Sequence, residues 1–520
     1  MYNWIFGWRC GLTWNETRSW PVRDLYGKVN TELSGLPTAF DVLMQTSGGT
    51  TTMSTKTGSL VMYSNYESVF NKNENNIAFV STTAHHSGDI GFRTIAVPYP
   101  GKKPGNYVVV SGASRKDLGD PLPEFYYTEI DMNLNGGLGG LTQAMQKMPN
   151  PTDVPGPVAA VRHANGEDYW IVAVCVPSHN YYPSKAQTYI NAWLLTKNGM
   201  SSTPVVSNLA MEVIYQNNSF GQIKLTPDGR NFVWTPLTPK SKTFYYGDFD
   251  DATGQVSNVN GITLPGADVV PEYIEYSPDI SLVYISANPY HLFVFKAEEL
   301  FGNTSATYAT VDKKRYVFPF YRTGQSKFGS MLQSPIGDER IYATSMNNND
   351  FYILENTNDF DNLKIYKTEE QTVGEYDRQE FLQEQGKARG TGYGLPLFPA
   401  SFFLAEPEIK AFGCTGNDNK YTVDITVTGT GPDQPVKLRW DFGDGSPVQD
   451  QPLVVGVSKY TMLHAYAASG IRNITVTPVR ANGTSLKAIK MPVNTTDCSI
   501  RTNRMIRTDL QNSKTIQVNR

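Results

Sequence analysis

The densest group of carboxylates that could do chemistry is Asp248, Asp250 and Asp251, in the segment Tyr246-Gly-Asp-Phe-Asp-Asp-Ala-Thr-Gly. Glycoside hydrolysis needs two carboxylates that face each other across one sugar-binding cleft. Adjacent carboxylates in a glycine-flanked turn are more typical of a solvated or cation-binding loop, and calcium prefers such oxygen ligands. We therefore predict a loop role for these aspartates, with a metal site as the alternative.

A second pair of carboxylates, Asp441 and Asp444, lies in the segment Trp440-Asp-Phe-Gly-Asp-Gly-Ser. Such a turn could hold Ca²⁺ through carboxylate and carbonyl oxygens. A turn in which each aspartate accepts hydrogen bonds from the backbone amides after it explains the same residues without an ion. We favour the self-bonded turn and keep calcium as the one cofactor that the sequence could accommodate.

The histidines and the glycine-rich segments give no catalytic constellation. His85 and His86 are adjacent, and neighbouring residues on a strand point to opposite faces, so both cannot bind one metal without a bulge. For His163, packing against Asp168 or against backbone at a turn is the simplest account. The glycine-rich run from Asn135 lacks a P-loop lysine, and no Gly-x-Ser-x-Gly or His-Glu-x-x-His motif occurs. We predict no catalytic residue and no enzyme activity.

The four cysteines are Cys10, Cys175, Cys414 and Cys498, with no Cys-x-x-Cys pair and no Cys/His spacing suited to zinc. Cys414 and Cys498 flank one small predicted domain. A disulfide between them would clamp the ends of that domain in an oxidising compartment. Four buried free thiols are the alternative interpretation.

Length and composition indicate a folded protein of more than one domain. A chain of 520 residues is too long for one ordinary core. Its 30 tyrosines, 44 glycines and 32 prolines favour short strands and many turns. A net charge of −4 gives no electrostatic footprint for nucleic acid, and no apolar run is long enough for membrane insertion. The segment that starts at Met1 does not have the features of a signal peptide.

Strand-sized runs rich in Val, Ile, Tyr, Phe and Thr recur between turn signals from about residue 50 to 370. Three turns resemble one another: Thr226-Pro-Asp-Gly-Arg, Ser277-Pro-Asp-Ile-Ser and Ser334-Pro-Ile-Gly-Asp. Their spacing of roughly 50 residues or slightly more is that of one four-stranded propeller blade. The pattern predicts an all-β fold with a β-propeller of about seven blades over residues 1–370, and an array of β-sandwiches is the alternative.

The rest of the chain divides into three parts. Residues 371–404 form a linker that begins polar and ends in the apolar run Gly394-Leu-Pro-Leu-Phe-Pro-Ala-Ser-Phe-Phe, whose aromatic side chains we expect to pack at the domain junction. Residues 405–497 show the alternation of a β-sandwich, as in Lys420-Tyr-Thr-Val-Asp-Ile-Thr-Val. Residues 498–520 are polar, and we expect a partly ordered C-terminal extension.

The predicted sandwich resembles the PKD domain, an immunoglobulin-like fold. The resemblance rests on Trp440-Asp-Phe-Gly-Asp-Gly-Ser, His464-Ala-Tyr and Gly470-Ile-Arg-Asn-Ile-Thr-Val, which occur in the family's order. It implies that Trp440 is the core aromatic residue and that Tyr466 fixes the chain where it crosses between the sheets. PKD domains generally act as spacers or interaction modules.

The N-terminal part resembles the propeller of PKD-domain-containing surface and secreted proteins of Bacteroidetes-type bacteria. Matching segments include Gly58-Ser-Leu-Val-Met-Tyr-Ser, Ile130-Asp-Met-Asn-Leu-Asn-Gly-Gly-Leu-Gly and Val161-Arg-His-Ala-Asn-Gly-Glu-Asp-Tyr-Trp. The chain departs from that family in lacking a signal peptide and a recognisable C-terminal secretion domain. The resemblance implies an extracellular or cell-surface location.

We therefore expect a non-enzymatic surface protein for binding or adhesion that recognises protein or glycan through propeller loops, with the PKD domain as a spacer. Aromatic pairs such as Tyr181-Tyr182 and Tyr245-Tyr246 would supply contacts, although packing within the blades also explains them. A structural component of a phage virion or contractile injection particle, bound to other subunits, is the alternative. A propeller-type carbohydrate-active enzyme is the second alternative.

Overall fold

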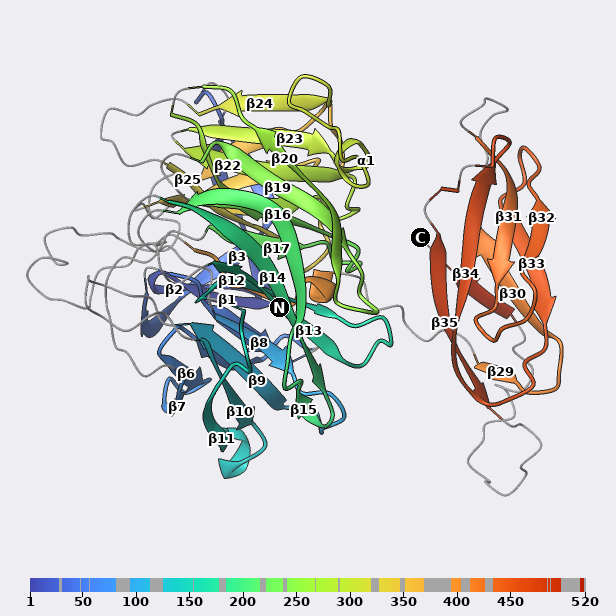
Figure 1. Ribbon diagram of the computed structural model, residues 1–520, viewed down its shortest axis with the longest axis horizontal. Helices are drawn as coiled ribbons and strands as arrows, with labels where there is room; N and C mark the ends of the chain where they lie inside the picture. The colour runs from blue at the N-terminus through green and yellow to red at the C-terminus, as the bar shows by residue number, and fades with distance from the viewer. Residues whose placement is uncertain are drawn as a thin grey trace, which may run out of the picture. The chain divides into compact units, whose positions relative to one another are not determined.

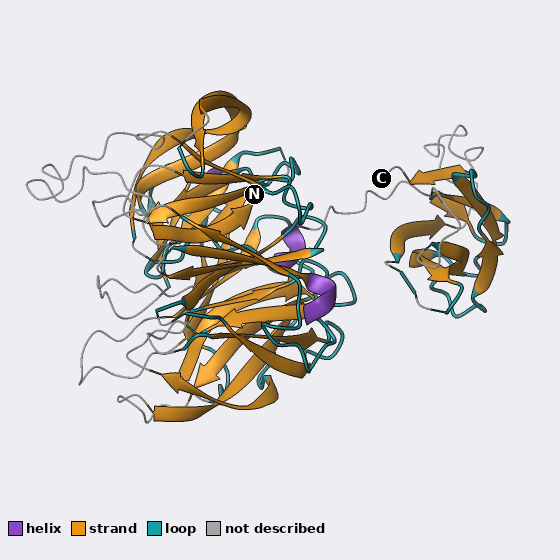
Figure 2. Cartoon of the chain, turned by 90° about the horizontal axis from the view of Figure 1, so that it is seen from above, coloured by secondary structure: helices purple, strands orange, loops and turns teal. Residues whose placement is uncertain are grey.

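The computed structural model separates the chain into two compact units, Met1–Leu404 and Ala405–Arg520. Strands dominate both units, and the helices are single short turns (Figure 2). No helix in the part of the chain described below is long and apolar enough to cross a membrane. The structure describes residues 1–27, 30–46, 48–55, 57–80, 94–112, 125–152, 154–176, 184–215, 221–236, 241–266, 268–288, 290–318, 327–346, 351–368, 394–403, 412–425, 434–483, 485–486, 488–496 and 515–518.

The first unit consists of small antiparallel sheets around a common centre (Figure 1). Three of them are β4 (Thr51–Ser54), β5 (Leu60–Ser64), β6 (Ser68–Asn71) and β7 (Asn76–Phe79); β8 (Thr94–Pro98), β9 (Asn106–Gly112), β10 (Phe125–Asp131) and β11 (Gly140–Lys147); and β12 (Val154–Arg162), β13 (Tyr169–Val176), β14 (Ser184–Thr196), β15 (Gly199–Met200) and β16 (Val205–Tyr215). Consecutive strands of each sheet are hydrogen-bonded, except that β16 pairs with β14 and not with the short β15.

Three further sets follow the same order from an inner to an outer strand. They are β17 (Gln222–Leu225), β18 (Asn231–Thr235), β19 (Thr243–Phe249) and β20 (Val256–Thr263); β21 (Val270–Tyr276), β22 (Leu282–Asn288), β23 (His291–Lys296) and β24 (Lys313–Val317); and β25 (Lys327–Gln333), β26 (Ile341–Met346), β27 (Phe351–Glu355) and β28 (Lys364–Thr368). The short helices are η1 (Asn135–Gly137), α1 (Ala297–Leu300) and η2 (Ala400–Phe403).

The N-terminal strands form one more blade and close the ring. They are β1 (Asn3–Phe6), β2 (Trp8–Asp24) and β3 (Asn30–Gln45), and the far end of β2 also pairs with β28, where Val22 lies opposite Thr368. The inner strands β1, β4, β8, β12, β17, β21 and β25 are neighbours in that order, and β1 packs with β25 through shared apolar residues. The described residues thus form seven blades, and the predicted all-β fold with an N-terminal propeller is confirmed.

Among the described residues, the inner strands of successive blades form no hydrogen-bonded ladder with one another. Side chains link the blades instead. An aromatic residue of one blade donates to a backbone carbonyl of the next in three places: Trp170 to Asp251 at 2.8 Å, Tyr246 to Asn303 at 2.8 Å, and Tyr284 to Thr357 at 2.7 Å. Each bond satisfies a polar group inside an apolar interface, which favours one fixed blade-to-blade geometry.

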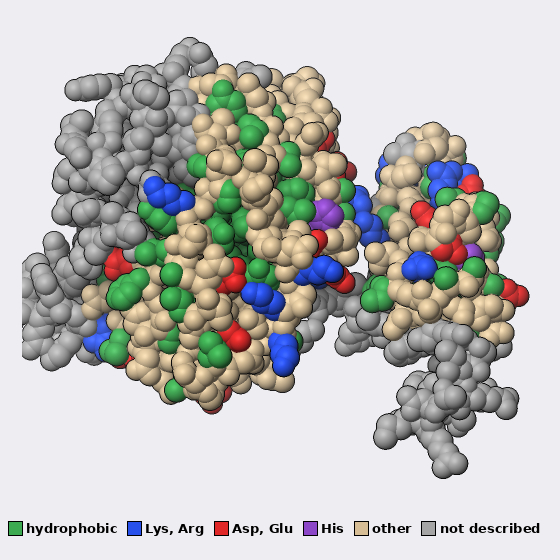
Figure 3. All heavy atoms as spheres, turned by 60° about the horizontal axis from the view of Figure 1, so that its bottom comes forward, with side chains coloured by type: hydrophobic (Ala, Val, Ile, Leu, Met, Phe, Trp, Pro, Cys, Tyr) green, Lys and Arg blue, Asp and Glu red, His purple; other side chains and the backbone are tan. Residues whose placement is uncertain are grey.

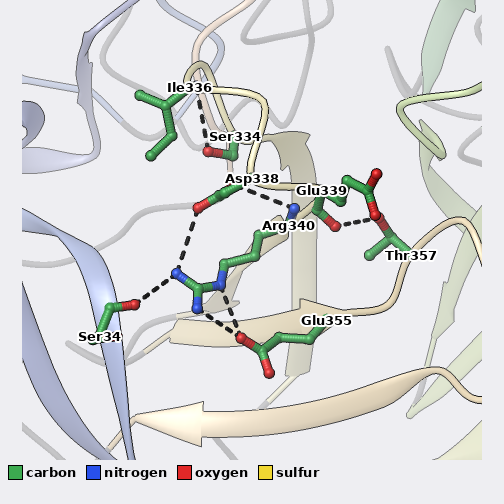
Figure 4. A network of polar contacts seen from close by, with 8 residues as sticks. All are labelled: Ser34, Ser334, Ile336, Asp338, Glu339, Arg340, Glu355 and Thr357. Atoms are coloured by element: carbon green, nitrogen blue, oxygen red, sulfur yellow. Dashed lines mark hydrogen bonds and ion pairs between the residues drawn. The ribbon is translucent and has the colours of Figure 1, made fainter. Parts of the chain in front are cut away.

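The last blade is linked to the first by Arg340 (Figure 4). Its guanidinium donates to the backbone carbonyl of Ser34 at 2.8 Å and holds the Glu355 carboxylate at 2.7 and 2.9 Å. A second carboxylate, that of Asp338, lies 3.4 Å away. The planar guanidinium can satisfy three acceptors at once, so one residue supports the seam where the two ends of the ring meet.

The three similar turns predicted from the sequence join the first and second strands of three successive blades. In two of them a hydroxyl bonds the following carboxylate, Thr226 to Asp228 at 2.6 Å and Ser277 to Asp279 at 2.7 Å. Gly229 has a φ of 72°, and the equivalent residue in the next blade is Ile280 with a φ of 63°. A left-handed backbone costs about 1–2 kcal/mol in a residue that has a Cβ.

The second unit is a sandwich of two sheets, ordered β29-β35-β34-β31-β32 and β33-β30-β36. Trp440 is fully buried in its core, and Tyr466 donates to the carbonyl of Phe442 at 2.9 Å, as the family resemblance implies. Assignment to the PKD family stays a prediction. The strands are β29 (Phe412–Cys414), β30 (Asn419–Asp424), β31 (Pro435–Asp441), β32 (Gln449–Pro452), β33 (Lys459–His464), β34 (Gly470–Arg480), β35 (Ile489–Thr496) and β36 (Thr515–Val518).

The two equivalent turn positions give a test of backbone strain. We expect Gly229→Ala to lower the free energy of unfolding by about 1–2 kcal/mol, because its backbone is left-handed, and its new Cβ would lie 3.2 Å from Val161. Ile280→Gly is the matched control, since it removes strain and should leave the stability unchanged or raised. Urea denaturation measures both. Equal losses in the two variants would contradict this explanation.

Candidate functional site

The centre of the propeller contains a segment of the chain itself, Gly394–Phe403, called the axial segment below. The backbone N–H of Leu395 donates to Ser330 Oγ in β25 at 2.6 Å. Leu397 pairs with the start of β4 in both directions: its N–H donates to the carbonyl of Thr50 at 2.7 Å, and its carbonyl accepts from Thr51 Oγ1 at 2.8 Å. Strands β25 and β4 flank the N-terminal blade, so the axial segment bridges the blades on either side of the ring's seam.

Apolar side chains of the axial segment fill the space between the inner strands. Leu395, Phe398 and Ala400 are between 2% and 7% exposed. Leu395 and Phe398 pack with residues of the first and last blades, and Ala400 packs with the middle blades. The inner strands β8, β12, β17 and β25 offer apolar side chains to it, among them Ile95, Val158, Ile223 and Met331. An open channel would leave these apolar surfaces without packing partners.

This position differs from the sequence prediction. We expected the aromatic side chains of the linker 371–404 to pack at the junction of two domains, whereas the structure places Gly394–Phe403 within the first unit. The apolar, proline-containing composition of the segment is evident in the sequence, but its position in the fold depends on the closed ring. Only a closed ring of inner strands creates an apolar channel, and local sequence does not reveal that channel.

Some backbone positions of the axial segment need no hydrogen-bond partner outside the segment. Pro396 and Pro399 have no N–H and need no acceptor, and the N–H of Phe402 donates to the carbonyl of Pro399 at 2.9 Å. The side chain of Ser401 is buried, and its Oγ has no hydrogen-bond partner among the described residues. A buried hydroxyl without a partner is destabilising, so this serine is not explained by packing.

A buried ion pair lies beside the axial segment. Lys224 Nζ in β17 is 2.5 Å from Glu275 Oε2 in β21, and the ammonium lies 5.7 Å from the ring centre of Phe403. Glu275 also accepts from the N–H of Gln333 in β25 at 3.0 Å and from the N–H of Tyr276 at 2.8 Å. The Glu275 carboxylate therefore joins three inner strands. Sequence reasoning missed this pair.

The surroundings of Lys224 bear on whether it could act as a nucleophile. Burial lowers the pKa of Lys224, and the charge of Glu275 opposes this effect. A lysine with a lowered pKa can attack a carbonyl when its amine is free and a substrate can reach it. Here the ammonium is held by a carboxylate, and Phe403 lies next to it. The arrangement suits a structural ion pair.

Removal of one partner of this pair should be costly. We expect Lys224→Met to lower the free energy of unfolding by about 3–5 kcal/mol, because Glu275 would remain buried without its counter-charge. The double variant Lys224→Met/Glu275→Gln should regain most of the loss, since no uncompensated charge remains. Urea denaturation of both variants and of Glu275→Gln completes the cycle. Additive losses in the double variant would show that the charges do not stabilise each other.

The aspartates Asp248 and Asp250 have hydrogen-bond partners within their own blade. Asp248 accepts from the amide groups of Asn231 at 2.9 Å and Asn258 at 2.7 Å. Asp250 accepts from the hydroxyl of Thr253 at 2.8 Å, and this bond is the main reason that its pKa is lowered. The carboxylates stabilise the turn from β19 to β20, and they do not face each other across a cleft.

The third aspartate of the group contributes through its backbone. The Asp251 carbonyl accepts from Trp170 Nε1 in the preceding blade. His163 lies in the same contact, and its ring Nε2 is 3.1 Å from the carbonyl of Ala252. The backbone N–H of His163 donates to the carbonyl of Asp168 at 2.8 Å. The prediction that backbone at a blade turn holds His163 is confirmed. This region is a blade-to-blade contact.

In the second unit, the turn with Asp441 and Asp444 is self-bonded. Asp441 accepts from the N–H of Gly443 at 2.9 Å, and Asp444 accepts from the N–H of Ser446 at 3.1 Å. The sequence did not predict that the other Asp444 oxygen lies 2.8 Å from Nε2 of His464. No three His, Cys, Asp or Glu residues in the described ranges are grouped as metal ligands, and a calcium site stays a prediction.

The electrostatics of this turn are unusual. Burial opposes ionisation of the Asp444 carboxyl, but hydrogen bonds from Ser446 and His464 outweigh it and lower the pKa of Asp444 to about 2. The His464 ring stacks on Phe442 with ring centres 3.9 Å apart. The stack fixes the imidazole against the core, so the carboxylate has a rigid partner.

The lowered pKa of Asp444 predicts a dependence of stability on acid. In the unfolded chain the carboxyl titrates near 3.8 and in the folded unit near 2. Its stabilisation is therefore complete above pH 4 and is lost as the pH falls through about 2. We expect Asp444→Asn to be less stable than the wild type at pH 7, with the difference disappearing below pH 2. Thermal unfolding followed by tryptophan fluorescence tests this, and a constant difference would contradict it.

The remaining predicted residues have mixed outcomes. Cys414 is disulfide-bonded, while Cys10 and Cys175 are buried and not part of a disulfide. Cys498 lies outside the described residues, and the Cys414–Cys498 pairing stays a prediction. Tyr246 is fully buried and Tyr245 stacks on Trp234, so this aromatic pair packs within the propeller. His85, His86, Tyr181 and Tyr182 also lie outside the described residues.

Comparisons with known proteins identify no family. No family model matches the chain, and no curated protein matches it. Among solved structures it is similar to hydrazine synthase of Kuenenia stuttgartiensis (TM-score 0.34, 11% identity, 56% of this chain and 72% of that chain). It is also similar to Hsv2p of Kluyveromyces lactis (0.33, 11%, 71% and 98%) and to the β-propeller domain of Cps50 (Swd1) from Myceliophteria thermophila (0.29, 10%, 62% and 97%). These scores are too low to carry an argument, and the propeller assignment rests on the strand order.

Proposed function

We propose that the protein is a non-enzymatic extracellular or cell-surface binding protein that recognises protein or glycan through the loops of its propeller. The observation that carries the proposal is the axial segment. Propellers surround a central channel, where a small ligand could be enclosed. In this chain Leu395–Phe403 packs there. While this segment occupies the channel, recognition of other molecules falls to the connections between strands.

The strand order divides these connections between two faces. Consecutive strands of a blade are antiparallel, so the link from the second to the third strand and the link to the next blade lie at the same face. Two long intervals belong to this set: residues 80–93 between β7 and β8, and residues 113–124 between β9 and β10. Residues 297–312 between β23 and β24, which include α1, belong to the other face. Long connections on a rigid scaffold are the usual carriers of recognition.

The charges also fit recognition of an uncharged or mixed surface. The face of the first unit shown in Figure 3 has lysine, arginine and acidic side chains interspersed with small apolar areas. Such a surface has no field of one sign that would attract a polyanion. The carboxylates best suited to glycosidase chemistry, Asp248 and Asp250, are engaged in their own turn. We propose that the second unit is a PKD-type spacer.

The proposal is tested with the full chain on a glycan array and in cross-linking to washed cell envelopes. Replacement of residues 113–124 by a short Gly-Ser linker should abolish saturable binding. The control Asp250→Asn lies in a turn at the opposite face and should keep it. Loss of binding in the control alone would place recognition at the other face. Release of reducing sugar from an array glycan would contradict the non-enzymatic proposal, and co-sedimentation only with particles would contradict the surface location.

A further inference from the structure

We propose that the central channel of the propeller is a peptide-recognition site, whose ligand is an extended, apolar, proline-containing segment of the type Gly394–Phe403. The chain's own axial segment occupies the site in the structure. The same segment of a second copy is the occupant that we propose in trans. This inference is independent of recognition by the loops.

The contacts of the axial segment are those of a bound peptide. Two N–H groups and one carbonyl, all from Leu395 and Leu397, bond to groups of the inner strands. Apolar side chains on both sides of this stretch are seated between blades. Main-chain hydrogen bonds that give affinity, combined with side-chain pockets that give specificity, are the general mode by which proteins recognise extended peptides.

The two prolines supply selectivity against other apolar peptides. A buried N–H without an acceptor is destabilising, and Pro396 and Pro399 have no N–H that needs one. A peptide with alanine at these positions would bring two more donors into an apolar channel and would lose the extended preference of proline.

Nothing in these contacts depends on the covalent connection of the segment to the rest of the chain. Its described hydrogen bonds reach β25 and the start of β4 or stay within the segment, and its apolar side chains line a cavity together with residues of β8, β12, β17 and β25. The covalent connection raises the local concentration of the segment at the channel. A copy that is supplied separately therefore meets the same site, in competition with the segment already present.

The experiment uses a full chain whose own segment is disabled by Leu397→Asp, together with a fluorescein-labelled synthetic peptide of residues 394–403. Leu397 is half-buried against apolar residues, and an aspartate there would face them without a polar partner, so the variant should leave its channel open. We expect saturable binding of the peptide to the variant, and binding at least about 100-fold weaker to the wild-type chain, whose own segment competes. A peptide with the same Leu397→Asp change should not bind, and a Ser401→Ala peptide should bind about tenfold more tightly, because it buries no unpaired hydroxyl.

A folded variant, judged by circular dichroism, that fails to bind the labelled peptide would overturn the proposal. So would equal binding of the wild-type and Leu397→Asp peptides. If the variant chain does not fold, the full wild-type chain with protease sites within 370–390 and 405–410 replaces it. After cleavage, exchange of the released segment for labelled peptide supports the proposal. Failure to exchange, or loss of the segment without binding of the labelled peptide, overturns it.

Discussion

The structure of the first unit depends on the filling of its central channel. Seven inner strands meet around one axis, and four of them, β8, β12, β17 and β25, present apolar side chains to the central space. Protein interiors tolerate few voids, because atoms that line a void lose their dispersion contacts. Leu395–Phe403 fills this space, and its backbone bonds to Thr50 and Ser330 on either side of the N-terminal blade. A segment late in the sequence thereby stabilises a seam formed by the earliest strands.

Several buried or partly buried polar groups hold the blades and their turns together. Lys224 and Glu275 join inner strands beside the axial segment, and Arg340 links the last blade to the first. Asp248 and Asp250 stabilise one turn, and the adjacent Asp251 carbonyl receives a tryptophan from the neighbouring blade. Carboxylates that are clustered in the sequence can thus accept hydrogen bonds that stabilise a turn or a blade. This is why a cluster of aspartates in a propeller turn is weak grounds for catalysis.

The parts of the fold that local chemistry determines could be predicted from the sequence. The Pro-Asp turns at Thr226 and Ser277, and the self-bonded turn at Asp444, depend on residues within a few positions of one another. The bond from His464 to Asp444 spans 20 residues, and the position of the axial segment requires a closed ring. Neither has a local signal. Ile280 also departs from expectation, because the surrounding turn imposes a left-handed backbone on a β-branched residue.

One longer-range signal was nevertheless present in the repeat. Lys224 and Glu275 are 51 residues apart, and Gln333 and Tyr276, which share a hydrogen bond, are 57 residues apart. These separations match the intervals between the three similar turns, from Thr226 to Ser277 and from Ser277 to Ser334. Inner strands one blade apart are spatial neighbours, so a lysine and a glutamate separated by one blade period at equivalent positions face each other. In this propeller, the buried interblade ion pair therefore consists of a lysine and a glutamate spaced by one blade period.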